Sequence, residues 1–151
     1  MELLPEWAPG IHPLIVHFPV ALLSLAVGLT VLAVFYNREW ITKTIVGLYV
    51  LGSLSALASY ISGRSAADSI GLNLKAEVAI GTHSDWALYT LIYFGVFTAI
   101  YYVVIYMLKK ESVGFRTIVA VLAIIGFFIL GQAAEYGGRL VFEYGLGVMK
   151  K

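Results

Sequence analysis

The chain has 151 residues, which predicts a single domain, and 60% of them are hydrophobic while only 13% are charged. A soluble protein this small could not bury so much apolar surface, so we expect an integral membrane protein with lipid as its solvent. A net charge of +1 gives no basic field for nucleic acid, and the absence of cysteine excludes disulfides, thiolate metal sites, cysteine nucleophiles and covalently attached haem.

Four apolar runs are long enough to cross a bilayer, which takes about 20 helical residues each. They cover roughly residues 14–36, 45–62, 86–108 and 118–134. Short polar segments join the first run to the second and the third to the fourth, which suits tight helix–helix connections. We therefore predict an all-α fold, an up-and-down four-helix bundle that forms one membrane domain over residues 1–151.

Two polar regions lie outside the predicted spans, at the same end of the bundle. Residues 64–81 contain glycine and serine and are expected to form a surface loop with a short helix. After Gly137 and Gly138, residues 139–148 mix apolar and charged side chains and are too short to span a bilayer. We expect this C-terminal tail to lie at the membrane interface.

Basic residues near the span ends give the orientation, because they favour the cytoplasmic side of a membrane. Five of them lie in or beside the two short connections: Arg38, Lys43, Lys109, Lys110 and Arg116. We therefore expect a multi-pass protein of the cell (inner) membrane with both termini outside the cytoplasm. The N-terminus carries Glu2 and Glu6 where a cleavable signal needs lysine or arginine, so no such signal is expected.

All three histidines lie at the N-terminal ends of the first and third spans, and thus at one end of the bundle. His12 precedes a proline and fits a helix N-cap. His17 lies about 7.5 Å deeper and roughly 140° round a regular helix, so the two share a face only if Pro19 distorts that helix. His83 follows the start of a T-x-x-D capping box, at a depth closer to that of His12 than to that of His17.

Small residues lie at helical spacing beside these histidines. Ala21, Ser24 and Gly28 share the face of His17, Ala87 shares that of His83, and the second span carries Gly52, Ala56, Ser59 and Gly63 along one stripe. Such stripes usually let helix backbones approach each other closely. The alternative is a slot for a flat group that an imidazole ligates, and a histidine inside a span favours this alternative for His17.

The opening and closing segments resemble a known family. Residues 12–19, His-Pro-Leu-Ile-Val-His-Phe-Pro, look like the HPxxVHFP signature of the bacterial and archaeal membrane family called domain of unknown function 2231. Residues 137–148 are similar to its closing GGxLVxxHGxGV pattern, and His83 matches the histidine at the start of its third span. The resemblance implies a four-helix membrane domain without an established activity. Where the family usually has a histidine in the closing pattern, this chain has Tyr144.

The leading functional hypothesis is a b-type haem protein of membrane electron transfer, because four-helix bundles commonly hold cofactors between facing side chains. We expect His17 and His83 as axial ligands, with His12 as an alternative ligand or a partner of a haem propionate. Ala21, Ser24, Gly28 and Ala87 would line the slot. Arg139 and Arg64 could pair with the propionates, since guanidinium groups suit carboxylates.

Two alternatives stay open. A zinc or copper site would combine the three histidines with Asp85, Glu135 or Glu143. A cofactor-free structural subunit of a larger membrane complex would instead turn its small-residue stripes outward, toward a partner. No nucleophile, base or substrate pocket can be named, so we expect an electron carrier or a subunit rather than a stand-alone enzyme. The redox partner and any homo-oligomer are left open.

Overall fold

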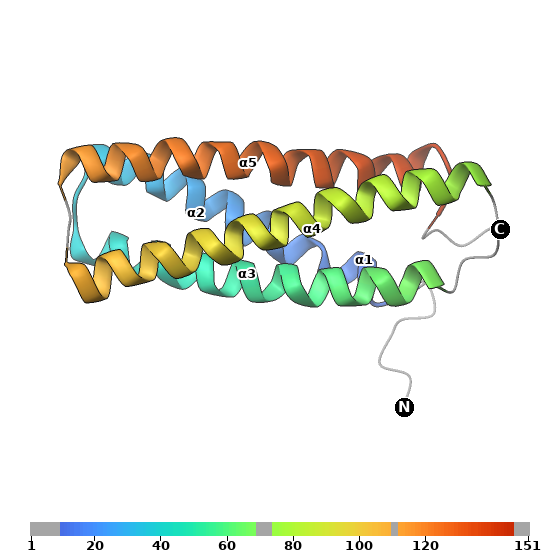
Figure 1. Ribbon diagram of the computed structural model, residues 1–151, viewed down its shortest axis with the longest axis horizontal. Coiled ribbons are helices and arrows are strands. Elements are labelled where there is room, and N and C mark those ends of the chain that lie inside the picture. Colours follow the sequence, from blue (N-terminus) through green and yellow to red (C-terminus); the bar gives the residue numbers. More distant parts are fainter. Residues whose placement is uncertain (1–9, 69–73, 110–111, 147–151) are drawn as a thin grey trace, which may run out of the picture.

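A computed structural model describes residues 10–68, 74–109 and 112–146 of the chain (Figure 1). Within them the elements are α1 (His12–Ile15), α2 (His17–Phe35), α3 (Glu39–Asp68), α4 (Leu74–Tyr102), the π-helix η1 (Val103–Leu108) and α5 (Val113–Phe142). Four helical stretches are long and apolar enough to cross a membrane, when α1 is taken with α2 and η1 with α4. The predicted all-α fold with four spans is confirmed.

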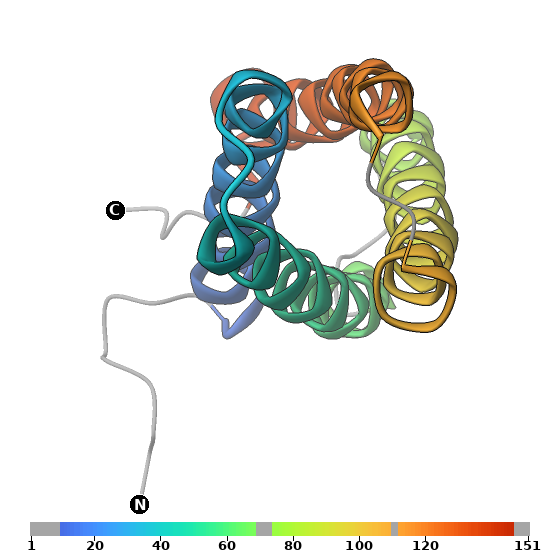
Figure 2. The same ribbon diagram turned by 90° about the vertical axis from the view of Figure 1, so that its left-hand side faces the viewer.

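The four long helices run up and down and stand at the corners of a square (Figures 1 and 2). Their neighbours round the square are α2 and α3, α3 and α4, α4 and α5, and α5 and α2. Consequently α2 faces α4 across one diagonal, and α3 faces α5 across the other. One end of the bundle holds α1, the end of α3, the start of α4 and the end of α5, and we call it the histidine end.

The helices at the histidine end are longer than the apolar pattern predicts. α3 continues to Asp68 and α4 begins at Leu74, so most of the loop expected over 64–81 is helical. α5 continues through the glycine pair to Phe142, so the first part of the predicted tail is also helix. Apolar runs mark only the lipid-embedded part of a helix, and polar residues extend it beyond the bilayer at little cost. The expected N-cap at Thr82 is wrong, because its hydroxyl donates to the Val78 carbonyl inside α4.

A short interruption at Val16 separates α1 from α2. Pro19 has no backbone N–H to donate to the carbonyl of Ile15, and its ring crowds that carbonyl. The break therefore falls where the proline predicts a bend. It leaves α1 as a single turn with Ile11, rather than His12, at its N-cap.

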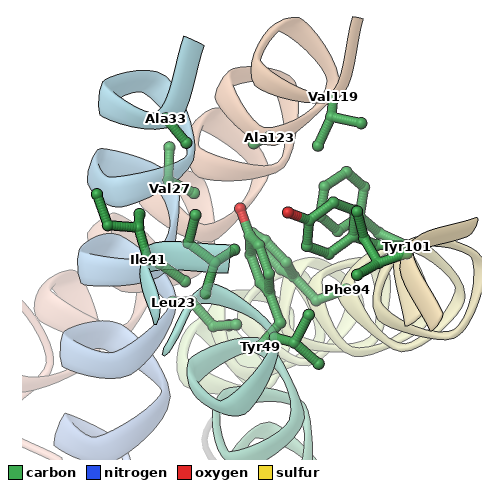
Figure 3. Packing of buried hydrophobic residues seen from close by; sticks show 14 of the residues in the cluster. Leu23, Val27, Ala33, Ile41, Tyr49, Phe94, Tyr101, Val119 and Ala123 are labelled. Atoms are coloured by element: carbon green, nitrogen blue, oxygen red, sulfur yellow. The ribbon is translucent and has the colours of Figure 1, made fainter. Parts of the chain in front are cut away.

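The half of the bundle away from the histidines has a dense aromatic core. Leu23, Ile45, Tyr49 and Phe94 are fully buried there (Figure 3). The Thr30 hydroxyl donates to the Ala26 carbonyl at 2.7 Å, so the Tyr49 hydroxyl, 2.9 Å from the Thr30 oxygen, is the donor of that second bond. Both hydroxyls thus find partners inside the bundle, as polar groups buried in lipid must.

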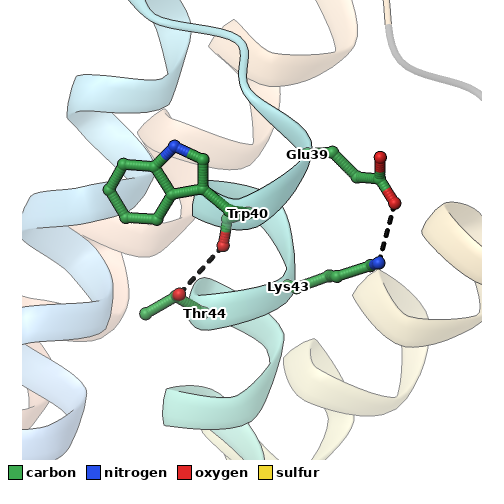
Figure 4. Close-up of polar contacts among 4 residues, drawn as sticks. All are labelled: Glu39, Trp40, Lys43 and Thr44. Carbon is green, nitrogen blue, oxygen red and sulfur yellow. Dashed lines mark hydrogen bonds and ion pairs between the residues drawn. The ribbon is translucent and has the colours of Figure 1, made fainter.

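The first turn of α3 has the features of a membrane interface. The Lys43 ammonium lies 2.7 Å from the Glu39 carboxylate, and the Thr44 hydroxyl donates to the Trp40 carbonyl at 2.8 Å (Figure 4). The Trp40 side chain is 65% exposed on the outside of the bundle. Tryptophan and charged side chains at a span end are typical of the level of lipid headgroups.

The close packing of aromatic rings against Gly126 predicts that Gly126→Ala destabilises the protein. A Cβ at Gly126 would lie 2.6 Å from Cε1 of Tyr93 and 2.8 Å from Cζ of Phe94, and both rings are held by the core. We expect a loss of about 1–3 kcal/mol, measured as a lower thermal unfolding temperature in detergent.

Gly131→Ala on the same helix is the matched control, because a Cβ there meets nothing within 4 Å. Alanine has the higher helix propensity, so this variant should be unchanged or slightly more stable. Equal unfolding temperatures for the two variants would contradict the packing described for Gly126.

Candidate functional site

Two of the three histidines lie beside each other inside the histidine end. The ring centroids of His12, on α1, and His83, on α4, are 6.5 Å apart, and the ring planes are inclined by 65°. α1 leads into α2, whose corner of the square lies diagonally opposite α4. The imidazoles therefore approach each other across the interior from opposite corners.

The His12 ring is oriented by α3. Its Nδ1 atom lies 3.0 Å from the Ser62 hydroxyl oxygen, and that hydroxyl donates its single hydrogen to the Ser59 carbonyl at 3.0 Å. While that hydrogen is on the Ser59 carbonyl, the Ser62 oxygen accepts from His12 and Nδ1 carries the hydrogen. The lone pair of a neutral His12 ring is then on Nε2.

The His83 ring is oriented in the same way by α5. Its Nδ1 atom lies 3.0 Å from the carbonyl oxygen of Ala133, and a carbonyl can only accept a hydrogen bond. Nδ1 is again the donor, and Nε2 again holds the lone pair. An imidazole whose Nδ1–H is fixed by a carbonyl or hydroxyl, with Nε2 available, is the usual arrangement of a metal-ligating histidine.

A glycine lies against each imidazole, on the second pair of opposite helices. A Cβ on Gly63 of α3 would lie 2.9 Å from Cε1 of His12, and a Cβ on Gly137 of α5 would lie 3.0 Å from Cε1 of His83. In each hairpin the histidine bonds to a group 50 residues further along the chain. The two hairpins thus supply the same set, one histidine and one glycine each.

The interior next to the pair is lined by small side chains of α3 and α5. Ala56 and Ser59 on α3 are buried, as is Ala133 on α5, whereas Gly52, further along α3, packs against Leu23 of the aromatic core. The buried Ser59 hydroxyl has no hydrogen-bond partner among the described residues. The neighbouring hydroxyls of Ser55 and Ser62 each donate to a carbonyl of their own helix.

The other predicted site residues lie elsewhere. His17 is exposed on the outside of α2, and its stripe faces outward with it, because Ala21 and Gly28 are exposed and Ser24 is only half-buried. The structure therefore does not bring His17 to His83, and His12 has the position facing His83. This follows from the 140° rotation expected between His12 and His17, which the break at Val16 does not remove.

Ala87 is half-buried on α4, one turn after His83. Arg64 and Arg139 are exposed at the histidine end, where Arg139 donates to the Glu135 carboxylate and lies 5.3 Å from the centre of the Tyr136 ring. The described residues contain no cluster of three or more histidine and acidic side chains that could hold a metal ion. The set of histidines and carboxylates expected for zinc or copper is therefore not assembled in the described part of the chain.

The sequence by itself does not single out Ser62, Ala133 and Gly137 as site residues. The predicted fourth span ends before Gly137 and Gly138, although Gly126, Ala133 and Gly137 recur at the spacing of one helix face. That small-residue spacing was the available signal, and on α3 the same signal did indicate Gly63.

Comparison with known proteins identifies a family and no activity. The family described as "Predicted membrane protein (DUF2231)" matches residues 8–150. No curated protein and no solved structure matches the chain significantly. The arrangement of the histidines therefore carries the functional argument.

The hydrogen bonds predict one tautomer for both paired histidines. Solid-state ¹⁵N NMR of the cofactor-free protein in bilayers, labelled at histidine, should give neutral rings with hydrogen on Nδ1 for His12 and His83. The spectra of His12→Ala and His83→Ala assign the signals. Neutral rings protonated at Nε2 would contradict the contacts described here.

Proposed function

The chain belongs to the DUF2231 family of predicted membrane proteins, and on that premise we propose that it is a b-type haem protein of membrane electron transfer. The haem would be held by the histidines of the first and third spans, His12 and His83. The observation that carries the proposal is the pair of adjacent imidazoles, with Nδ1 of each ring hydrogen-bonded to a neighbouring helix and neither Nε2 atom hydrogen-bonded among the described residues.

The separation of the rings suits one metal atom between them. A bond from a metal ion to an imidazole nitrogen is about 2.0–2.1 Å long, so the ring centres of two imidazoles on opposite sides of one ion are roughly 6.3 Å apart. The rings of His12 and His83 are 6.5 Å apart. The two rings are thus close to the separation that such coordination requires.

The number of ligands favours haem over a bare metal ion. Zinc and copper sites in proteins need three or four side-chain ligands, whereas a porphyrin supplies four nitrogens itself and leaves two axial positions. The described residues supply two adjacent imidazoles and no cluster of three or more histidine and acidic side chains. Bound haem would contribute a one-electron iron couple, and the chain would contribute its ligands, their orientation and an apolar environment.

The helices beside the histidines carry small side chains, as a flat group bound between them would require. The histidine-bearing corners lie on one diagonal of the square, so the plane of a porphyrin between the two rings would extend toward the other two corners, α3 and α5. The small residues on these helices at this level are Gly63, Ser59, Gly137 and Ala133. The exposed guanidinium groups of Arg64 and Arg139 lie at the same end and could pair with propionates at the surface. Ser59 adds a buried hydroxyl that has no hydrogen-bond partner in the described part of the chain.

The protein is a multi-pass membrane protein, and we extend this to its location. Arg38, Lys43, Lys109 and Arg116 belong to the end opposite the histidines. We place the protein in the cell membrane, with this end in the cytoplasm and the histidine end outside, because basic residues near span ends favour the cytoplasmic side. The chain ends at residues 1–9 and 147–151 lie outside the described residues.

A structural subunit is the second candidate, and one observation favours it. His17, Ala21 and Gly28 form an outward stripe on α2, the arrangement expected if a neighbouring membrane helix packs there. A colourless protein purified from haem-supplied cells, together with a native size above that of one chain, would favour this candidate over haem.

The proposal predicts the spectra of three alanine variants. The detergent-purified protein should show a low-spin b-type spectrum when oxidised and when reduced with dithionite, with near-stoichiometric iron. His12→Ala and His83→Ala should each lose that spectrum, because each removes one axial ligand.

His17→Ala is the control, because its imidazole faces outward and should be dispensable for the spectrum. Loss of haem in His17→Ala but not in His12→Ala would instead support the pair expected from the sequence, His17 with His83. Insertion of every variant is checked by its yield from membranes.

The glycines give an independent prediction. Gly63→Val and Gly137→Val place carbon atoms where the imidazoles lie. When a competing haem acceptor is added, the affinity with which these variants retain haem should therefore be about tenfold or more weaker. Gly131→Val on α5 makes the same exchange at an exposed position with open space and should leave retention unchanged. Equal retention in all three variants would contradict the placement of haem between α3 and α5.

A further inference from the structure

A groove of about 180 Å³ lies between α4 and α5 at the histidine end. Its lining includes Val78, Ala79 and Thr82 from α4, and Tyr136, Arg139 and Glu143 from α5. Thr82 directly precedes His83, and Tyr136 directly precedes Gly137. The groove therefore lies on the same stretches of α4 and α5 as His83 and Gly137.

The groove combines an apolar side with hydrogen-bonding groups. Val78 and Ala79 contribute methyl groups, and Tyr144 adds a second phenol to that of Tyr136. Neither phenol oxygen has a hydrogen-bond partner within the described part of the chain. The Arg139 guanidinium gives a hydrogen to Glu135 and retains further N–H donors.

The charges of the groove disfavour an anion. Arg139 is already paired with Glu135, and Glu143 brings a second carboxylate to the same rim. The three groups together carry one net negative charge, which would repel a lipid phosphate. A neutral ring with polar oxygens suits these side chains better, because phenol and guanidinium groups donate to carbonyl oxygens and aromatic faces pack on a flat ring.

We infer that this groove binds the head ring of a membrane quinone or its quinol. The volume is below the 300–1,000 Å³ of typical pockets for drug-sized ligands, so it suits the ring alone, with the isoprenoid tail in lipid. The purpose of the site rests on the proposed function, since a quinone beside a haem would be its electron partner. Binding itself needs no haem.

The test measures binding to the haem-free protein in lipid nanodiscs, by titration calorimetry with a short-chain benzoquinone and a short-chain naphthoquinone. Saturable binding of at least one of them, beyond that of empty nanodiscs, is expected. The double variant Tyr136→Phe with Tyr144→Phe should weaken it by about tenfold, because it removes two hydrogen-bond donors and keeps the rings. The Tyr102→Phe variant, with its exposed phenol at the other end of α4, should bind as the parent protein does.

Several results would overturn the inference. One is the absence of saturable binding of either quinone, and another is unchanged binding in the double variant. Displacement of the quinone by a short-chain anionic phospholipid, but not by its zwitterionic analogue, would identify a headgroup site instead. A protein that binds quinone but shows no haem spectrum would retain this inference while the proposed function fails.

Discussion

The hydrogen bonds from His12 to Ser62 and from His83 to Ala133 are the interactions on which the arrangement of this bundle's polar end depends. Both rings are half-buried between helices, and a buried polar group needs a hydrogen-bond partner, which each Nδ1–H finds on a neighbouring helix. Those acceptors lie on α3 and α5, the helices next to the histidine-bearing ones. Once both Nδ1 atoms are bonded, the only nitrogens left for chemistry are the two Nε2 atoms. The proposed haem function builds on that consequence.

Close contact between ring and helix requires glycine at two positions. An imidazole can reach the Ala133 carbonyl only if the side chain four residues later leaves room, and Gly137 does so, as Gly63 does beside His12. A glycine inside a helix costs about 1 kcal/mol relative to alanine, so its presence here trades helix propensity for the approach of the histidine. Each hairpin therefore contributes one histidine packed against one glycine, and this repetition suits the proposed flat group between two equivalent ligands.

The two halves of the bundle differ in how their interiors are filled. Away from the histidines, the stacked and edge-on rings of Tyr49, Phe94, Phe97 and Tyr101 fill the interior. Toward the histidines, α3 and α5 contribute glycine, alanine and serine, and the Ser59 hydroxyl has no hydrogen-bond partner among residues 10–68, 74–109 and 112–146. The aromatic half stabilises the four-helix arrangement, and the proposed binding site lies in the other half. The groove behind His83 then adds a second polar region at the same membrane face.

The sequence by itself determined that this is a four-span helical membrane protein, because apolar runs of bilayer length have no other stable solution in lipid. It also determined that the histidines gather at one end, since parallel spans begin on the same side. It did not determine which histidines meet. His12 and His17 differ by 140° of helix rotation, and only the packing of α1 against α3 decides that His12 faces inward while His17 faces out.

The sequence also did not reveal the ends of α3, α4 and α5. Hydropathy marks the boundary of the lipid, whereas a helix ends where its backbone hydrogen bonds end. The contact of Gly137 with His83 joins residues 54 positions apart, and such a contact exists only once the fold has formed.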